Sequence, residues 1–170
     1  MQIKIAVTDA NIFIDLHELG LTHAFFLIGF EVHTTIAVLN ELYAEQHQFL
    51  QTYVGAGKLK VHNLLEEDFL AIQLASYPKS LSPSDQSVLH IANKLNACVL
   101  SSDKALRNCA KNKAIEYHGM LWIFDRLVET KVLTKISAAQ KLQELLRINL
   151  MFSNNPQLVA EIQKRLAAWR

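Results

Sequence analysis

The stretch from Leu81 to Arg107 constrains the fold of this chain more than any other segment. It opens with Ser-Pro-Ser-Asp, in which Ser82 suits a helix N-cap and Asp85 falls at the acidic position of a capping box. Apolar residues then recur at helical spacing, and residues 97–100, Ala-Cys-Val-Leu, form the short apolar run typical of a parallel strand covered on both faces. The segment therefore predicts a helix, a buried strand and, from Lys104, a second helix.

An acid follows a strand at two places in the chain. Residues 3–7 alternate as a strand that ends at Asp9, where a helix running to about Gly20 begins, and Asp103 follows the strand at 97–100 in the same way. Aspartate is a preferred helix N-cap, so each acid taken alone has an ordinary structural explanation. Because the carboxyl ends of parallel strands share one edge of a sheet, the pair together predicts a site at that edge.

Strands and helices alternate along the first two thirds of the chain. Further strands are expected at 31–35, 58–62 and 114–118, with helices at 21–28, 36–48, 49–54 and 66–76 between them. This alternation predicts an α/β fold with a parallel sheet of about five strands flanked by helices.

The chain after Gly119 predicts only helices. One helix is expected over 120–129, a second after a capping box at Ser137–Gln140, and a third from Asn155. We expect one domain over residues 1–170, with 134–170 as a helical hairpin packed on the α/β core.

Composition excludes several classes of protein. The chain has 170 residues, 51% of them hydrophobic, which suits one globular domain, and the net charge of +1 does not by itself indicate a nucleic-acid partner. Cys98 and Cys109 both lie in apolar segments, so a reducing cytoplasm is expected rather than a disulfide scaffold. The longest apolar run, residues 24–30, is too short to span a bilayer, and the amino terminus lacks the layout of a signal peptide. No membrane association is expected.

Four acids stand out as candidates for chemistry: Asp9, Glu41, Asp85 and Asp103. Glu41 is expected in the second turn of the helix at 36–48, whereas Asp15 is expected to be a solvated helix residue. Carboxylates that converge repel one another unless a cation intervenes, and all-oxygen ligands suit Mg²⁺ or Mn²⁺. Such an ion can ionise a water and hold a phosphodiester for in-line attack.

These pieces resemble the PIN domain, a family of metal-dependent ribonucleases that includes many toxins of toxin–antitoxin pairs. The matching segments are Asp-Ala-Asn after the first strand, Thr-Thr-Ile-Ala-Val-Leu-Asn-Glu at 34–41, the Asp85 helix start, and Leu-Ser-Ser-Asp-Lys-Ala-Leu-Arg at 100–107. The resemblance covers residues 3 to about 121. It implies the strand order 3-2-1-4-5, an acidic Mg²⁺ or Mn²⁺ site and endonucleolytic RNA cleavage.

The resemblance also implies roles for particular residues. By position, the family's acidic quartet corresponds to Asp9, Glu41, Asp85 and Asp103, with Asn11 and Ser101 as supporting residues. Besides RNA, the partners expected are an antitoxin protein and a second copy of the chain. Asn11 and Ser101 have the equally good alternative of a turn residue and a strand-end hydroxyl.

A basic helix face follows the last acid. Lys104, Arg107 and Lys111 recur at helical spacing after Asp103 and are candidates for contacts with RNA phosphates. An ordinary solvated helix face is the alternative.

Other functions remain open on the sequence. An aspartyl-phosphate phosphatase would need Asp-x-Asp where Asn11 stands, and a receiver domain would need an aspartate after the third strand, near His62. A non-catalytic interaction module on the same fold, or another Mg²⁺-dependent phosphate-ester hydrolase, is compatible with the residues present.

Overall fold

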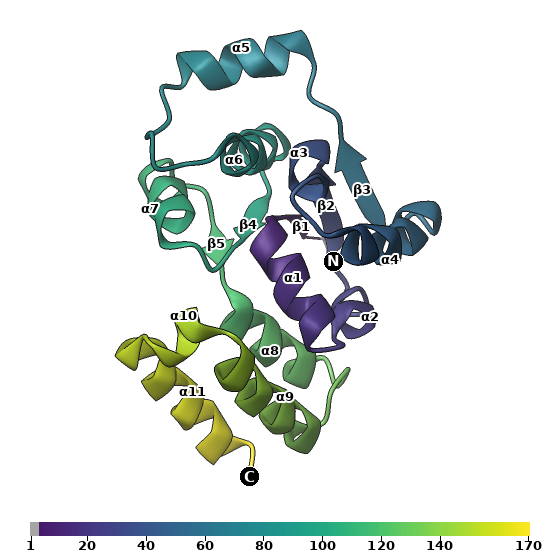
Figure 1. The fold of residues 1–170 in the computed structure, drawn as a ribbon, viewed down its shortest axis with the longest axis vertical. Coiled ribbons are helices and arrows are strands. Elements are labelled where there is room, and N and C mark those ends of the chain that lie inside the picture. Colours follow the sequence, from purple (N-terminus) through teal and green to yellow (C-terminus); the bar gives the residue numbers. More distant parts are fainter. Residues whose placement is uncertain (1–3) are drawn as a thin grey trace. The chain divides into compact units, whose positions relative to one another are not determined.

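A parallel five-stranded sheet forms the centre of the fold. The structure is a computed structural model that describes residues 4–170. The strands are β1 (Ile5–Thr8), β2 (Glu31–Thr35), β3 (Leu59–His62), β4 (Cys98–Leu100) and β5 (Tyr117–His118), in the order β3-β2-β1-β4-β5 (Figure 1). All four strand pairs are parallel, which confirms the predicted sheet and its order. The beginning of the predicted first strand, at Ile3, lies outside the described residues.

The central strands are the most deeply buried. In β1 and β4, Ala6, Val7, Val99 and Leu100 have no exposed surface. Burial on both faces is the reason that residues 97–100 are uniformly apolar instead of alternating. Because β1 lies between β2 and β4, Asp9 leaves the sheet at the middle of its carboxyl edge.

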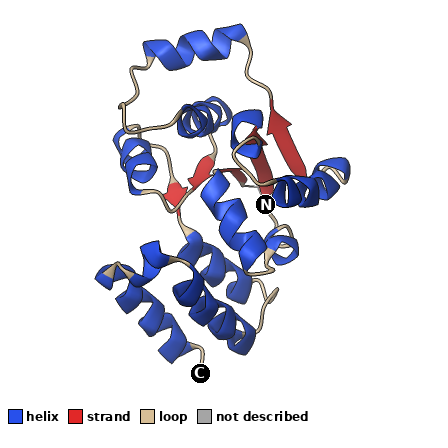
Figure 2. Ribbon diagram, in the orientation of Figure 1, coloured by secondary structure: helices blue, strands red, loops and turns tan. Residues whose placement is uncertain are grey.

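Helices connect the strands and make up the rest of the chain (Figure 2). Their bounds are α1 (Ala10–Glu18), α2 (Thr22–Phe25), α3 (Ile36–Leu39), α4 (Ala44–Gly55), α5 (Glu66–Leu74), α6 (Pro83–Leu95), α7 (Lys104–Asn112), α8 (Met120–Glu129), α9 (Lys135–Ile148), α10 (Leu150–Ser153) and α11 (Pro156–Ala168). No helix within residues 4–170 is long and apolar enough to cross a membrane.

The chain divides into two compact units. One consists of the residues up to Ile14 together with Gly29–Met120 and contains the sheet; the other consists of Asp15–Ile28 and Leu121–Arg170 and is helical. The helical unit therefore draws on an early segment of the chain as well as on the carboxyl-terminal helices.

The predicted helix over 36–48 is wrong, since the chain leaves helical geometry between α3 and α4. Thr35 caps α3 by accepting the N–H of Val38 at 3.2 Å, and Tyr43 has an extended backbone (φ −63°, ψ 155°) at the start of α4. Val38 and Leu42 are buried, whereas Tyr43 is 75% exposed. One continuous helical spacing over residues 36–48 therefore does not describe which side chains are buried here.

Two smaller boundaries also differ from the prediction. The second carboxyl-terminal helix begins at Lys135, because Thr134 rather than Ser137 is its N-cap and accepts the N–H of Ser137 at 3.1 Å. The fifth strand pairs only at Tyr117–His118, since Ala114 has a left-handed backbone (φ 56°) that begins this segment as a turn.

Candidate functional site

Asp9 is the most buried acid at the carboxyl edge of the sheet. Its side chain follows β1 directly, and the residue is 2% exposed. One carboxylate oxygen accepts the N–H of Ile12 at 3.0 Å, which caps the start of α1. The hydroxyl of Ser101, at the end of the neighbouring strand β4, donates to the other oxygen. The Asp9 carboxylate is therefore held by the first turn of α1 and by the residue that follows β4.

Ser101 links Asp9 to the next acid. Its hydroxyl oxygen accepts the backbone N–H of Asp103 at 3.0 Å while its proton goes to Asp9. Asp103 is half-buried and is the N-cap of α7, where its Oδ1 accepts the N–H of Leu106 at 2.8 Å. The capping role predicted for Asp103 is confirmed, and it leaves the second carboxylate oxygen without a bond to the helix.

Asp85 reaches the same region from α6. The predicted capping box is present: Ser82 accepts the N–H of Asp85 at 3.1 Å, and Asp85 accepts the N–H of Ser82 at 3.2 Å. The second turn of α6 is tied to the end of β2 by a hydrogen bond of 2.8 Å between the hydroxyls of Thr35 and Ser87. This buried pair holds the amino-terminal part of α6 beside β2, and sequence reasoning missed it because serine and threonine at these places carry no pattern of their own.

The three aspartates act on one another electrostatically. Burial, followed by the nearby charges of Asp85 and Asp103, raises the pKa of Asp9 to about 7, against the favourable bonds from Ser101 and Ile12. Burial and then the charge of Asp103 also raise the pKa of Asp85. Nearby like charges disfavour the ionised form of each carboxylate in this way.

Glu41 and Asn11 differ from the three aspartates in that both are exposed. Glu41 lies in the exposed turn between α3 and α4, and Asn11 is exposed in the first turn of α1. Among residues 4–170 no group of three or more His, Cys, Asp or Glu side chains is already placed to hold a metal ion. The structure thus brings Asp9, Asp85 and Asp103 into mutual influence without forming a closed ligand cage.

The donor set nevertheless fits a hard divalent cation. Asp9, Asp85 and Asp103 offer only carboxylate oxygens, the ligands that Mg²⁺ and Mn²⁺ prefer. The pKa of Asp9 is raised mainly by burial, and the charges of Asp85 and Asp103 add a smaller repulsion that a cation would relieve. Mg²⁺ commonly keeps several waters and takes only one or two carboxylates, so an open arrangement is compatible with it.

The basic residues of α7 do not form a uniform surface. Lys104 and Lys111 are exposed, whereas Arg107 is half-buried with its guanidinium carbon 5.2 Å from the centroid of the Tyr117 ring. A nitrogen of Arg107 also lies 3.4 Å from the position that a Cβ on Gly119 would occupy. Arg107 thus has a packing role that the two lysines lack.

Asp15 was expected to be solvated, and that prediction is wrong. It is 8% exposed in the helical unit, where the side-chain amide of Asn149 donates to its Oδ1 at 3.0 Å. Burial raises its pKa to about 6. The apolar neighbours Phe13, Ile14 and Leu16 are the sequence signal that could have suggested burial.

A parallel 3-2-1-4-5 sheet with aspartates at its carboxyl edge defines an α/β protein of the class that binds its ligands at that edge. A protein-family model described as a PIN domain matches residues 5–167, and the chain belongs to this family. The match extends through the carboxyl-terminal helices, beyond the part of the chain in which the sequence motifs were found. A search of curated proteins found no match.

Proposed function

We propose that this protein is a metal-dependent endoribonuclease that uses Asp9, Asp85 and Asp103, completed by Glu41, to bind Mg²⁺ or Mn²⁺. The observation that carries the proposal is that Asp9, Asp85 and Asp103 lie close enough to act on one another electrostatically, with the Ser101 hydroxyl bonded to both the Asp9 carboxylate and the Asp103 backbone. PIN domains are generally metal-dependent nucleases, and membership of the family supports the same reading.

The residues at the site suggest which part of the reaction each would perform. A divalent cation at this site would lower the pKa of a bound water and neutralise the phosphodiester under attack. Asp9 is the natural central ligand, because Ser101 and the N–H of Ile12 fix both of its oxygens. Ser101 is a positioning residue that orients Asp9 and the start of α7 together. Glu41, in its exposed turn, is free to approach the ion from the side of α3.

The ionisation of the three aspartates affects how a metal ion would bind. Asp9 must be ionised to bind a cation, and burial holds part of its population protonated near neutral pH. Asp85 lies in the first turn of α6 and Asp103 is the N-cap of α7, and at both positions the aligned backbone dipoles favour negative charge and partly offset the repulsion.

The proposal includes a biological setting. The partners we propose are a single-stranded RNA substrate, an antitoxin protein and a second copy of the chain, with the protein acting as the toxin in the cytoplasm. Cys98 and Cys109 are both buried free thiols, which fits a reducing compartment. Growth arrest on expression of the chain, lost in Asp9→Asn, is the outcome expected of a toxin.

The test is RNA cleavage by the purified protein with and without Mn²⁺. Asp9→Asn, Glu41→Gln, Asp85→Asn and Asp103→Asn should each lower the cleavage rate at least about a hundredfold, by the usual size of a lost catalytic ligand or acid–base group. Glu67→Gln, which alters an exposed acid on α5, is the matched control and should cleave normally. Full activity in any two of the four site variants, with circular dichroism showing all of them folded, would overturn the assignment.

A further inference from the structure

A cavity of about 340 Å³ lies where β2 and β3 end, in the unit that contains the sheet. Its walls come from α3, the segment after β3, α5 and the first turns of α6. Its lining includes the apolar residues Ile36, Phe69 and Ile72 and the amides of Asn40, Asn63 and Gln86. Its volume is at the small end of the range for pockets that hold small molecules, which suits one planar ring system rather than a helix of a partner protein.

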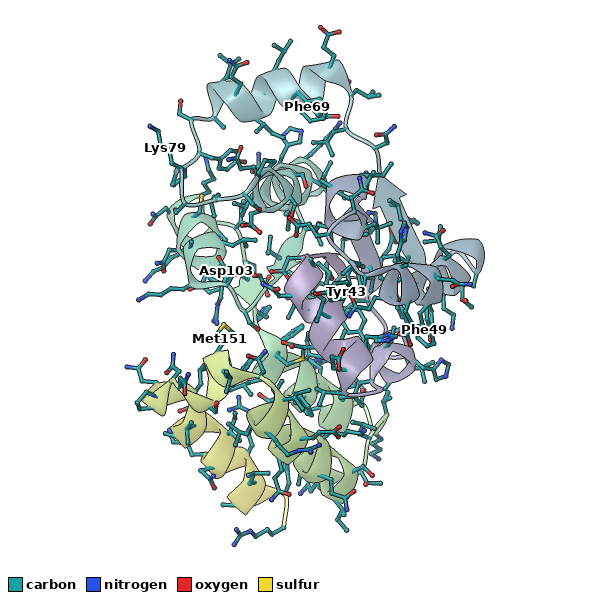
Figure 3. All side chains as sticks on the ribbon, viewed as in Figure 1. Tyr43, Phe49, Phe69, Lys79, Asp103 and Met151 are labelled. Atoms are coloured by element: carbon teal, nitrogen blue, oxygen red, sulfur yellow. The ribbon has the colours of Figure 1, made fainter. Side chains whose placement is uncertain are left out.

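The cavity combines a flat apolar surface with hydrogen-bonding groups. Phe69 is 60% exposed on α5 and is labelled in Figure 3, and Ile36 on the opposite wall is 40% exposed. The amides of Asn40 and Asn63 are exposed and have no hydrogen-bond partner within residues 4–170. Gln86 donates through Nε2 to the carbonyl of Leu81 at 3.1 Å, which leaves its Oε1 as an acceptor.

The helix that carries Phe69 is tied to α6 through the preceding residue, Asp68. Asp68 is 5% exposed, and its Oδ1 accepts from His90 at 2.8 Å and from Lys94 at 3.1 Å, both on α6. Its Oδ2 accepts the N–H of Leu65 at 2.9 Å and caps α5. These bonds anchor the first turn of α5 to α6, so the backbone that carries Phe69 is already placed beside the cavity before a ligand binds.

Two lining residues of the cavity are sequence neighbours of proposed site residues. Asn40 immediately precedes Glu41, and Gln86 immediately follows Asp85, so each wall residue has its Cα about 3.8 Å from that of a proposed site residue. A nucleotide next to the scissile phosphate would therefore have its base within reach of the cavity.

We propose that this cavity binds one unpaired nucleobase of the RNA substrate, stacked on Phe69 and bonded at its edge by Asn40, Asn63 and Gln86. The inference rests on the proposed nuclease function and names the substrate class, single-stranded RNA. Bases in single strands are commonly recognised by stacking on aromatic side chains together with hydrogen bonds to their edges. Base stacking on the ring supplies affinity that a net charge of +1 does not.

The experiment measures binding of fluorescein-labelled oligoadenylate, oligouridylate and oligocytidylate by fluorescence anisotropy, in EDTA so that no cleavage occurs. Phe69→Leu keeps an apolar side chain but removes the aromatic face, and should weaken binding of the preferred oligonucleotide roughly 5- to 50-fold, the size of one lost stacking contact. Phe69→Tyr should restore it. Leu70→Ala, the adjacent residue on α5, is 54% exposed and does not line the cavity, so it should bind like the wild type.

A fully abasic oligonucleotide of the same length separates base stacking from other effects. The loss in Phe69→Leu should disappear with this probe and with a duplex of the same sequence, since neither offers an unpaired base.

Equal affinity of wild type and Phe69→Leu for every oligonucleotide, in a protein that still cleaves RNA, would overturn the nucleobase site alone. Absence of RNA binding and cleavage in the wild type would overturn the nuclease proposal with it. A change of oligomeric state in Phe69→Leu, with RNA affinity unchanged, would reassign the surface to protein contacts.

Discussion

At the scale of single residues, the acids of this chain differ in what surrounds them. Asp9 and Asp15 both belong to the opening Asp-Ala-Asn-Ile-Phe-Ile-Asp segment and both are buried. Asp9 bonds to groups at the sheet edge, whereas Asp15 bonds to Asn149, 134 residues further along the chain. The first environment is a candidate for chemistry, and the second is a structural anchor.

The Asp15 anchor predicts a pH-dependent stability. Its pKa of about 6 lies above the ordinary aspartate value, because the folded protein favours the protonated carboxyl. The contribution of this carboxyl to the free energy of unfolding is therefore fully present below about pH 4 and is lost as the pH rises through 6. Asp15→Asn should therefore stabilise the protein at about pH 8 by on the order of 1–3 kcal/mol, with a gain that shrinks toward pH 4. Urea unfolding followed by tryptophan fluorescence measures this, since Trp122 and Trp169 both lie in the helical unit.

The control for this prediction is Glu67→Gln, which removes an exposed acid from the other unit. It should show no gain that grows with pH. A destabilised Asp15→Asn at every pH would mean that the ionised carboxylate, rather than the neutral form, is the better partner of Asn149.

Residues with local signals were predictable from the sequence. The capping box of Ser82 and Asp85 depends on groups within one helical turn, and both of its bonds are present in the structure. The surroundings of Asp15 depend on Asn149, which is distant in the sequence, so hydrophobic periodicity could not predict its burial. The turn at Glu41 interrupts the predicted helix over 36–48 without a glycine or proline to signal it.

At the scale of elements, α7 carries the residues that would contact RNA outside the site. Lys104 and Lys111 are exposed, but Arg107 packs against the Tyr117 ring. Replacing the arginine would disturb this packing together with the charge, so the lysines give the cleaner test. The sequence placed all three on one helix and could not distinguish them, because the aromatic partner of Arg107 comes from β5.

The double variant Lys104→Ala and Lys111→Ala should weaken RNA binding and lower the slope of log affinity against log salt by roughly 1–2 units, about one for each lost phosphate contact. Anisotropy titrations over a range of salt concentrations measure the slope. Lys131→Ala with Lys135→Ala removes two exposed lysines elsewhere and should leave it unchanged. An identical slope in both double variants would mean that Lys104 and Lys111 are ordinary solvated residues that do not contact RNA phosphates.

At the scale of the whole molecule, the chain joins a sheet-containing unit to a helical unit, and the proposed chemistry lies entirely in the first. The alternation of strands and helices predicted the α/β class, and the family resemblance supplied the strand order that the structure confirms. The sequence did not show that Asp15–Ile28 belongs with the carboxyl-terminal helices, because that grouping is made by packing between distant segments.

The central claim is that the acids at the carboxyl edge of the sheet bind a divalent cation, and calorimetric titration with Mn²⁺ tests it most directly. Binding should be tighter at about pH 8 than at about pH 6, because Asp9, with a pKa of about 7, must release its proton to the solvent. The melting temperature should rise with Mn²⁺ concentration, since a ligand of the folded state stabilises it by mass action. Glu67→Gln should behave like the wild type and Asp9→Asn should lose the response. Equal Mn²⁺ binding by wild type and Asp9→Asn, or none by either, would contradict the account.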